Sequence, residues 1–298
     1  MEMKKRIFAL GFFDGVHLGH QALLAQCRKL AERQGAEPAA ITFDSHPQSL
    51  FSPNPPPLIN SALDRQKLLE GYGIRYICHL AVTKEVMSTN WRDFLEQLLA
   101  LGAVGFVCGD DFRFGNRGEG TGEKLREFCR ERGLPCVVVG AQSLGGIRIS
   151  STYIRRQLET GDMETAVRFL GHPHVLTGAV VPGQQLGRKL GIPTANLRLP
   201  QGLAVPKFGV YACRAVVEGK TYAAVTNIGT RPTVEGTGIT VEPWILDYEG
   251  DLYGREITLE FHKFLRPEMK FPDLAALQQE IRKNAAETRD YFRKSDIS

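Results

Sequence analysis

The spacing of apolar residues changes character near residue 174, and this change limits the folds that the chain can adopt. Before it, short apolar runs alternate with segments in which apolar residues recur at helical spacing. Such alternation is typical of βαβ units and predicts an α/β domain with a mostly parallel sheet. After it, runs rich in Val, Thr and Tyr are separated by glycine turns, which predicts a small antiparallel β-barrel. A chain of 298 residues is long enough for two domains, which we expect to be residues 1–173 and 174–298.

The predicted elements follow this division. In the first part we expect strands over 6–10, 39–43, 76–80, 105–107 and 135–139, and helices over 62–72, 90–101, 122–132, 152–160 and 163–170. In the second part we expect strands over 175–181, 209–217, 221–228, 238–248 and 257–264. The chain then closes with a C-terminal helix, in which Leu274, Leu277 and Ile281 recur at helical intervals and Pro272 takes a first-turn position.

Composition excludes several classes of protein. Hydrophobic residues make up 43% and charged residues 23%, which is globular usage. The net charge of +4 is too small for a dedicated nucleic-acid binder, and an apolar stretch of about 20 residues that could span a membrane is missing. Six cysteines form no CxxC pair, so we expect reduced thiols in a cytoplasmic protein.

The densest signal is Gly11-Phe12-Phe13-Asp14-Gly15-Val16-His17-Leu18-Gly19-His20, where the first predicted strand passes into a long helix. A helix start offers free backbone N–H groups to an anion, and the glycines allow the backbone to approach it closely. His17 and His20 are three residues apart and emerge on one face of that helix. We therefore expect a site that holds a triphosphate and stabilises charge at its α-phosphorus. The competing interpretations are a surface histidine for His20 and a metal site for the pair.

A second segment, Ile149-Ser150-Ser151-Thr152-Tyr153-Ile154-Arg155, begins another predicted helix. Ser151 alone is explained equally well as an N-cap. Two or three hydroxyls followed by Arg155 also make a suitable seat for a leaving pyrophosphate.

These two segments resemble the nucleotidylyltransferase superfamily with its HxGH and ISSTxxR motifs, and more closely the adenylyltransferase half of bacterial bifunctional riboflavin kinase/FAD synthetases. Residues 42–47, Thr-Phe-Asp-Ser-His-Pro, resemble the family's TFxPHP, with Ser45 in place of the usual proline. Residues 109–115, Gly-Asp-Asp-Phe-Arg-Phe-Gly, resemble its GxDFxFG. The resemblance implies a Rossmann-like fold for residues 1–173.

The reaction that the resemblance implies is attack by the phosphate of FMN on the α-phosphorus of ATP, which yields FAD and pyrophosphate. A phosphate monoester is already anionic near neutral pH, so a strong general base is not required. The resemblance makes His17, His20 and Arg155 catalytic. It assigns ATP and its phosphates to Gly11, Phe12, Asp14, Gly15, Gly19, Ser150, Ser151 and Thr152, and the flavin to Phe43, His46, Pro47, Asp111 and Phe112. Core packing explains Phe43 and Phe112 equally well.

In the second half, Gly187-Arg188-Lys189-Leu190-Gly191-Ile192-Pro193-Thr194-Ala195-Asn196 joins a basic glycine loop to a stiff turn. The backbone N–H groups of such a loop can surround ATP phosphates. We expect Gly187, Arg188, Lys189 and Gly191 to bind the phosphates in this way. Thr194 and Asn196 lie two residues apart, so extended backbone puts both oxygens on one side, where they can hold Mg²⁺. The loop lacks the GK[ST] ending of a Walker A motif, and an ordinary surface turn explains it equally well.

Glu242 lies in a predicted strand, on the face that alternation shares with Trp244 and Leu246. A carboxylate in such a setting can accept a proton from an alcohol, although an exposed strand glutamate is commoner. The following residue, Pro243, lacks an N–H for the ladder, so we expect an edge or a bulge there.

The resemblance continues through this half. The GRxLGxPTAN segment, residues 206–211, 227–233, Glu242 and residues 251–254 are similar to the riboflavin kinase module in order. The resemblance implies that Glu242 is the general base for the 5′-hydroxyl of riboflavin, and that this hydroxyl attacks the γ-phosphorus of ATP. It also implies that Thr194 and Asn196 bind Mg²⁺ and that Asn227 contacts the flavin. Pro243-Trp244 replaces the more usual apolar-His pair.

The sequence therefore predicts a bifunctional enzyme that converts riboflavin to FMN and FMN to FAD, with small molecules rather than nucleic acid or membrane as partners. Two alternatives stay open. One is a flavin-binding regulatory protein without turnover. The other is a nucleotidylyltransferase for a different phosphorylated acceptor, because the HxGH motif does not choose the substrate.

Overall fold

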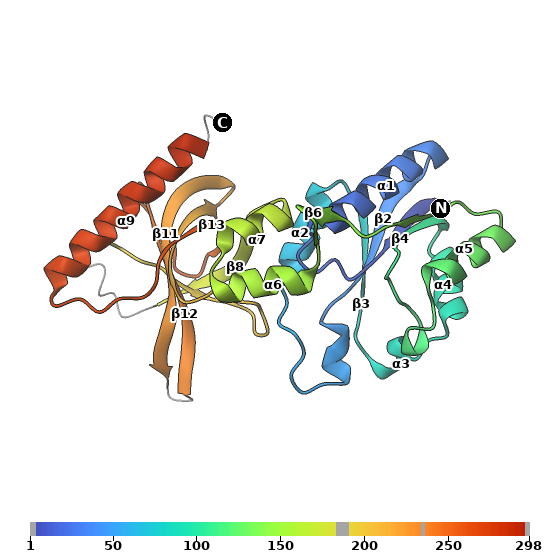
Figure 1. The fold of residues 1–298 in the computed structure, drawn as a ribbon, viewed down its shortest axis with the longest axis horizontal. Coiled ribbons are helices and arrows are strands. Elements are labelled where there is room, and N and C mark those ends of the chain that lie inside the picture. Colours follow the sequence, from blue (N-terminus) through green and yellow to red (C-terminus); the bar gives the residue numbers. More distant parts are fainter. Residues whose placement is uncertain (1–3, 183–190, 234–235, 296–298) are drawn as a thin grey trace. The chain divides into compact units, whose positions relative to one another are not determined.

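The computed structural model describes residues 4–182, 191–233 and 236–295 (Figure 1). The chain divides into two compact units, Met1–Ser151 and Thr152–Ser298. Among the described residues, none of the helices is both long enough and apolar enough to cross a membrane.

The first unit is built on a five-stranded parallel sheet of order β3-β2-β1-β4-β5. This confirms the α/β prediction, and the predicted bounds of its strands differ from the observed ones by at most two residues. The strands are β1 (Arg6–Leu10), β2 (Glu37–Phe43), β3 (Tyr76–Leu80), β4 (Ala103–Gly109) and β5 (Cys136–Val139). The helices are α1 (Leu18–Gln34), α2 (Ala62–Gly71), α3 (Lys84–Met87), α4 (Trp91–Ala100) and α5 (Gly122–Glu131), with short turns η1 (Pro47–Leu50) and η2 (Asn116–Gly118) and the ribbon β6 (Ser143–Leu144) and β7 (Ile147–Arg148).

Both faces of this sheet are buried, as a parallel sheet requires. Alternate residues of β1 enter different core clusters: Ile7 and Ala9 pack with α1, whereas Phe8 and Leu10 pack with α4 and α5. After β3 the chain returns to the other side of β1 to form β4. The strand order therefore reverses at the β1–β4 pair, and open α/β sheets bind ligands outside the carboxyl ends of the strands at such a reversal.

The second unit contains a closed antiparallel barrel of order β10-β11-β12-β9-β8-β13. This confirms the predicted small barrel and the C-terminal helix, which packs on the barrel through Ala285 beside Val210, Val225 and Leu246. The strands are β8 (His174–Val181), β9 (Asn196–Arg198), β10 (Gly209–Val217), β11 (Lys220–Thr233), β12 (Gly236–Ile245) and β13 (Glu256–Arg266), and the helices are α6 (Ser151–Thr160), α7 (Met163–Leu170) and α9 (Leu274–Ser295).

Several sequence predictions in this unit were wrong in detail. Strand β11 continues to Thr233 and not only to residue 228, and the short strand β9 was not predicted. Helix α9 begins at Leu274 and not at Pro272, because the Asp273 carboxylate accepts the Ala276 N–H at 2.8 Å and takes the capping position. Strand β12 ends at Ile245 and not at residue 248, because Asp247 adopts a left-handed backbone with φ of 58°.

Pro243 lies where its missing N–H is tolerated. The β11–β12 register runs through it as Thr226↔Pro243 without a shift, so the strand is not bulged against β11. On the other side β12 pairs with β9 only at Val241↔Leu197, and the Pro243 carbonyl accepts the Ala195 N–H at 2.9 Å. The proline nitrogen therefore faces this short pairing, where its missing N–H is tolerated. The predicted edge or bulge was wrong, because β12 has a partner on each side in the closed barrel and its register against β11 does not shift.

A pair of glycine substitutions tests the packing of the first unit. Gly115 has φ of 73°, and a Cβ there would lie 2.6 Å from Trp91 Cα, whereas Gly133 has φ of 64° and open space around it. We expect Gly133→Ala to lower the free energy of unfolding by about 1 kcal/mol through backbone strain alone. Gly115→Ala should lower it by about 3 kcal/mol, because the overlap adds to the strain.

The measurement is denaturant unfolding in a Trp244→Phe background, which leaves Trp91 as the only indole of the chain. Equal losses for the two variants would contradict this account of Gly115.

Candidate functional site

The first candidate site lies at the carboxyl edge of the parallel sheet. The segments that follow β1 and β4 flank the point where the strand order reverses. The first of them leads into α1, whose N-terminal N–H groups face this edge. Two of the predicted motifs of this half, residues 11–20 and 109–115, therefore meet at one position of the sheet.

A strained turn joins β1 to α1. Phe13 and Val16 have positive φ angles of 58° and 40°, which are rare outside glycine and unusual for a β-branched residue. Phe13 is fully buried, and Asp14 Oδ1 accepts the Ile59 N–H at 2.8 Å. Strain of this kind persists only where the surroundings hold it, and it clusters at ligand-binding segments.

His17 and His20 lie face to face at the start of α1. His17 caps the helix, since its Nδ1 accepts the His20 backbone N–H at 3.3 Å. The two rings stack with centroids 3.6 Å apart and planes 10° apart. A Cβ at Gly19 would lie 3.2 Å from the His17 ring, so the glycine leaves room for it. In stacked rings the nitrogen lone pairs run parallel and do not converge, which disfavours the metal-site interpretation.

His20 is neutral in this environment. Its ring packs edge-on against Phe13 at 5.3 Å between centroids. Its Nδ1 is buried and has no hydrogen-bond partner among the described residues. Burial lowers the pKa of His20 well below its ordinary value, and nearby His17 and Arg65 lower the pKa further. His20 is therefore not the exposed surface histidine of the competing interpretation but a neutral hydrogen-bonding group.

An aromatic cluster lies beside the turn. The ring of Phe12 contacts Phe43 at 6.2 Å and His46 at 5.3 Å between centroids, and the Arg65 guanidinium lies 4.9 Å from the Phe12 ring centre. His46 caps the turn η1, which begins at Pro47. Four residues that the sequence assigned to nucleotide or flavin are thus brought together, and half-buried Phe43 suits both flavin contact and core packing.

The GxDFxFG segment follows β4 at the same edge. Asp111 is exposed and forms an ion pair with Arg148 of β7. Phe112 stacks on Phe114 with centroids 6.0 Å apart and packs against the core cluster on one face of the sheet. The structure therefore gives Phe112 a packing role and leaves Asp111 on the surface.

The ISSTxxR segment contributes Ser151 to the first unit. Its Oγ donates to the Asp14 carbonyl at 2.8 Å, which ties the start of α6 to the strained turn across 137 residues of sequence. Ser150 directly precedes it. Exposed Thr152 and half-buried Arg155 belong to the second unit, within the first turns of α6.

Two residues at this edge escaped sequence analysis. Asn60 is fully buried, and neither its Oδ1 nor its Nδ2 has a partner among the described residues. Arg65 is also fully buried; it donates to the Phe43 carbonyl, while its Nε and Nη1 have no partner in the described part of the chain. Burial lowers the pKa of Arg65, while Asp14 and Asp44 raise it. Buried polar atoms in this state call for a ligand or water. Only the observed packing identifies them, because Asn and Arg near a helix start are common.

The second candidate site is a polar row across three barrel strands. The register places Asn227 of β11 directly opposite Glu242 of β12. The Val241↔Leu197 pair places Asn196 of β9 opposite Glu242 on its other side. Directly opposed residues of antiparallel strands share a face, so Asn196, Glu242 and Asn227 form one row.

Thr194 precedes this row in sequence and also lines a hollow, whose lining does not include Asn196, Glu242 or Asn227. It lies two residues before Asn196 with buried Ala195 between them, so extended backbone points it to the face of the row. The hollow has a volume of about 430 Å³, a size typical of small-molecule sites. The other lining residues are Val180, Pro193, Ala195, Pro243, Ile245, Tyr248, Gly250, Asp251, Leu252 and Tyr253.

Part of the predicted phosphate loop lies outside the described residues. Gly187, Arg188 and Lys189 belong to that part. Gly191 is described, and its φ of 67° is the left-handed conformation that glycine adopts at low cost.

Glu268 is a further acidic group beside the row. A Cβ on Gly229 would overlap the Glu268 carboxylate and would lie 3.4 Å from Asn227 Nδ2. The carboxylate therefore lies close to the Asn227 amide. Sequence analysis missed it because no motif marks the segment after β13.

Two family models match this chain, one in each half. The model of the family described as FAD synthetase matches residues 1–153, and that described as riboflavin kinase matches residues 170–292. A protein of Listeria monocytogenes named bifunctional riboflavin kinase/FMN adenylyltransferase is 35% identical over 297 residues, which covers 97% of this chain and 93% of the relative. A protein of the same name from Pseudomonas fluorescens is 37% identical over 95% of this chain and 92% of the relative.

The chain belongs to the bifunctional riboflavin kinase/FMN adenylyltransferase family. The resemblance inferred from the HxGH, ISSTxxR and PTAN segments is thereby confirmed. One match spans the sheet with the histidine pair, and the other spans the barrel with Glu242.

A solved structure agrees with the whole fold. A crystal structure described as a macrolide-efflux protein from Streptococcus pneumoniae has a TM-score of 0.87 and 27% identity, over 97% of this chain and 95% of that one.

The state of His20 gives a test in the ligand-free protein. We expect its imidazole to stay neutral as the pH falls through 6.5, because burial lowers its pKa from that ordinary value. The unfolded chain takes up this proton below pH 6.5 and the folded one does not, so the contribution of His20 to stability decreases as the pH falls. The measurement is an NMR titration of the ring signals assigned with a His20→Asn variant. A midpoint at or above 6.5 would overturn the electrostatic account of the pair.

Proposed function

We propose that this chain phosphorylates riboflavin with ATP to give FMN and ADP, and then adenylylates FMN with a second ATP to give FAD and pyrophosphate. The second reaction belongs to residues 1–173 and the first to residues 174–298. Family membership supports both activities. The observation that carries the proposal is that each half has its own polar cluster: the histidine pair at the sheet reversal, and the row of Asn196, Glu242 and Asn227 on the barrel.

In the adenylyl transfer, a phosphate oxygen of FMN attacks the α-phosphorus of ATP, and the bond to the β-phosphate oxygen breaks. The attacking group is already an anion, so the protein's contribution is positioning and charge stabilisation. Neutral His20 suits hydrogen bonding to a phosphate oxygen, and His17 is fixed beside it as the helix cap. The backbone of Gly11, Phe12, Asp14, Gly15 and Gly19 encloses the phosphates at the start of α1.

The leaving pyrophosphate and the flavin take the neighbouring groups. We assign pyrophosphate to Ser150, Ser151, Thr152 and Arg155, supported in part by the Ser151–Asp14 hydrogen bond at the turn. The flavin is assigned to the edge near Phe43, His46, Pro47, Asp111 and Phe112. The orphaned atoms of buried Asn60 and Arg65 add donors and an acceptor at this edge.

In the kinase reaction, Glu242 accepts the proton of the riboflavin 5′-hydroxyl as its oxygen attacks the γ-phosphorus of ATP, and ADP leaves. Asn227 lies opposite Glu242 and is positioned to contact the flavin. We assign ATP to the hollow that Thr194 lines, because the hollow is large enough for a nucleotide.

Mg²⁺ fits this row. Thr194 and Asn196 offer two neutral oxygens on one side of extended backbone, and Mg²⁺ prefers few protein oxygens together with substrate phosphates. When bound, the ion neutralises charge on the transferred phosphoryl group. Gly187, Arg188, Lys189 and Gly191 are assigned to the same phosphates.

Two variants, each altered at one of the two sites, test the proposal. His17→Ala combined with His20→Ala should lower the rate of FAD formation by about 10²-fold or more and leave FMN formation intact. Glu242→Gln should lower FMN formation by about 10²- to 10⁴-fold and leave FAD formation from supplied FMN intact. The measurement is chromatographic separation of the flavins after incubation with ATP and Mg²⁺.

Glu256→Gln is the matched control for the base, because it makes the same change on another strand of the barrel. Loss of both half-reactions in either folded variant would exclude separate sites. Tight flavin binding without ATP consumption by the unaltered chain would favour the regulatory alternative.

A Thr194→Val variant tests the metal assignment. Valine keeps the shape and removes the oxygen, so the Mg²⁺ concentration for half-maximal FMN formation should rise by about tenfold or more. FAD formation in the same protein is the internal control and should keep its Mg²⁺ dependence. An unchanged requirement in the kinase reaction would remove Thr194 from the ligand set.

We also propose a cytoplasmic location, with small molecules as the partners. All six cysteines are free thiols, which is the usual state in a reducing compartment.

A further inference from the structure

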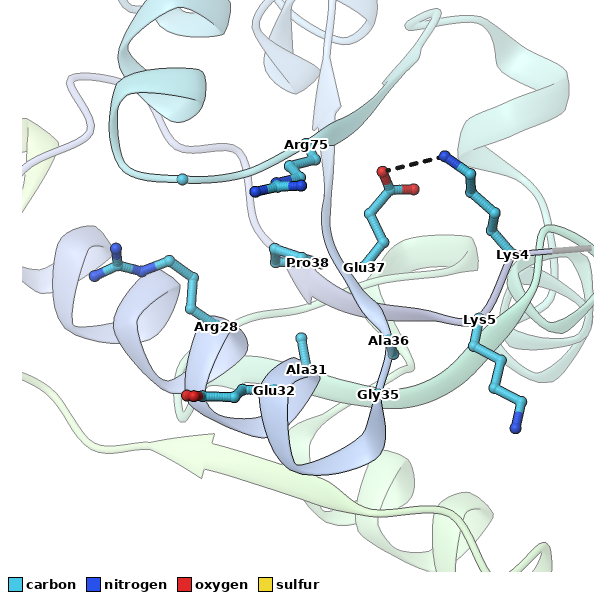
Figure 2. A pocket seen from close by; sticks show the side chains of 11 residues that line it. Lys4, Lys5, Arg28, Ala31, Glu32, Gly35, Ala36, Glu37, Pro38 and Arg75 are labelled. Carbon is cyan, nitrogen blue, oxygen red and sulfur yellow. Dashed lines mark ion pairs between the residues drawn. The ribbon is translucent and has the colours of Figure 1, made fainter.

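A basic hollow lies at the amino edge of the parallel sheet, on the side away from the histidine pair. Its walls come from the residues ahead of β1, the end of α1, the start of β2 and the turn ahead of β3 (Figure 2). Its volume is about 890 Å³, within the range of small-molecule sites. The lining residues are Lys4, Lys5, Arg28, Ala31, Glu32, Gly35, Ala36, Glu37, Pro38, Gly73 and Arg75.

Positive charge exceeds negative charge in this hollow. Four cationic side chains and two carboxylates line it. Glu37 is already engaged, by Lys4 at 3.8 Å and by Arg6 at 3.4 Å. Among the described residues, Lys5, Arg28 and Arg75 form no ion pair or side-chain hydrogen bond, and all three are exposed.

Arg28 and Arg75 are arranged as a pair. Figure 2 shows the two side chains extending to the same side of the hollow, Arg28 from α1 and Arg75 from the segment ahead of β3. Gly73 has φ of 85°, and a Cβ there would lie 2.8 Å from Arg28 Cδ, so the glycine leaves space for the arginine stem. Guanidinium groups hold phosphate oxygens through paired N–H donors.

Two features oppose an anion here, and they limit the choice of ligand. Glu32 lies one turn beyond Arg28, and α1 ends at the hollow with its negative dipole end. Gly35 satisfies two of the carbonyl groups at that helix end, because its N–H donates to the carbonyls of Ala31 and Glu32. A ligand must therefore carry several negative charges. Because aromatic side chains are missing from the described lining, a stacked base is not expected.

We propose that this hollow binds a compact polyphosphate, such as pyrophosphate or a longer inorganic chain, with Arg28 and Arg75 as its main contacts and Lys5 at the opposite rim. The site is separate from both ATP sites and goes beyond the proposed function. Pyrophosphate is a product of the adenylyl transfer, so the protein's own chemistry supplies one such anion.

Amine footprinting of the full chain tests this site without interference from the ATP sites. The protein is treated with a limiting amount of an acetylating ester, and the rates at Lys4 and Lys5 are measured by mass spectrometry, with exposed Lys29 of α1 as internal reference. Pyrophosphate and tripolyphosphate, in separate arms, should slow acetylation at Lys5 by about threefold or more near saturation and leave Lys29 unchanged.

The double variant Arg28→Ala, Arg75→Ala should raise the half-protecting concentration, which is the concentration of pyrophosphate or tripolyphosphate that gives half of the maximal protection of Lys5. We expect a rise of about tenfold or more. Arg126→Ala with Arg130→Ala removes the same charge from exposed positions of α5 and should leave the protection unchanged. Glu32→Gln should lower the half-protecting concentration, because it removes the opposing carboxylate. Formation of FMN and FAD should persist in all these variants, which separates this inference from the proposed function.

Three outcomes would overturn the proposal. One is absence of protection by both phosphates. Another is equal weakening in the two double-arginine variants, which would show a diffuse charge effect. The third is protection by a glutamate-rich peptide but by neither phosphate, which would point to an acidic protein partner.

Discussion

Buried packing and hydrogen bonds hold the turn between β1 and α1 in its strained conformation. Phe13 fills the core although its φ is positive, Asp14 accepts a buried backbone N–H, and the Asp14 carbonyl accepts the Ser151 hydroxyl. These contacts fix the first turn of α1, and with it the stacked rings of His17 and His20. The candidate site of the first unit thus depends on apolar packing and hydrogen bonds within the turn, while its polar atoms stay available to a ligand.

Electrostatics differs between the two edges of the same sheet. At the carboxyl edge, burial and the nearby Arg65 keep His20 neutral, so that edge offers hydrogen bonds and a single buried guanidinium. At the amino edge, exposed cationic side chains gather beside a helix C-terminus. The first arrangement suits charge that develops during a reaction, and the second suits reversible binding of an ion that is already charged.

The polar row on the barrel depends on strand register. Glu242 meets Asn227 through the β11–β12 register, and it meets Asn196 only because β9, short as it is, pairs with β12 at Val241↔Leu197. A slip of one residue would move Glu242 to the opposite face of the strand. The substitution of Pro243-Trp244 for the usual pair therefore leaves the polar row intact, and Trp244 packs toward α9.

The sequence by itself determined the division into a parallel α/β unit and an antiparallel barrel, most of the longer elements, and the positions of the motifs. Elements α3, β6, β7 and β9 were not predicted, and β11 extends five residues beyond its predicted end. Periodicity and glycine spacing are local properties, so they are readable along the chain. Only the tertiary structure decided that β9 completes the barrel, that Asn60 and Arg65 are buried at the carboxyl edge, and that Lys5, Arg28 and Arg75 surround one hollow. These facts depend on which distant segments pack together, and the burial and charge of a group follow from that packing rather than from its neighbours in sequence.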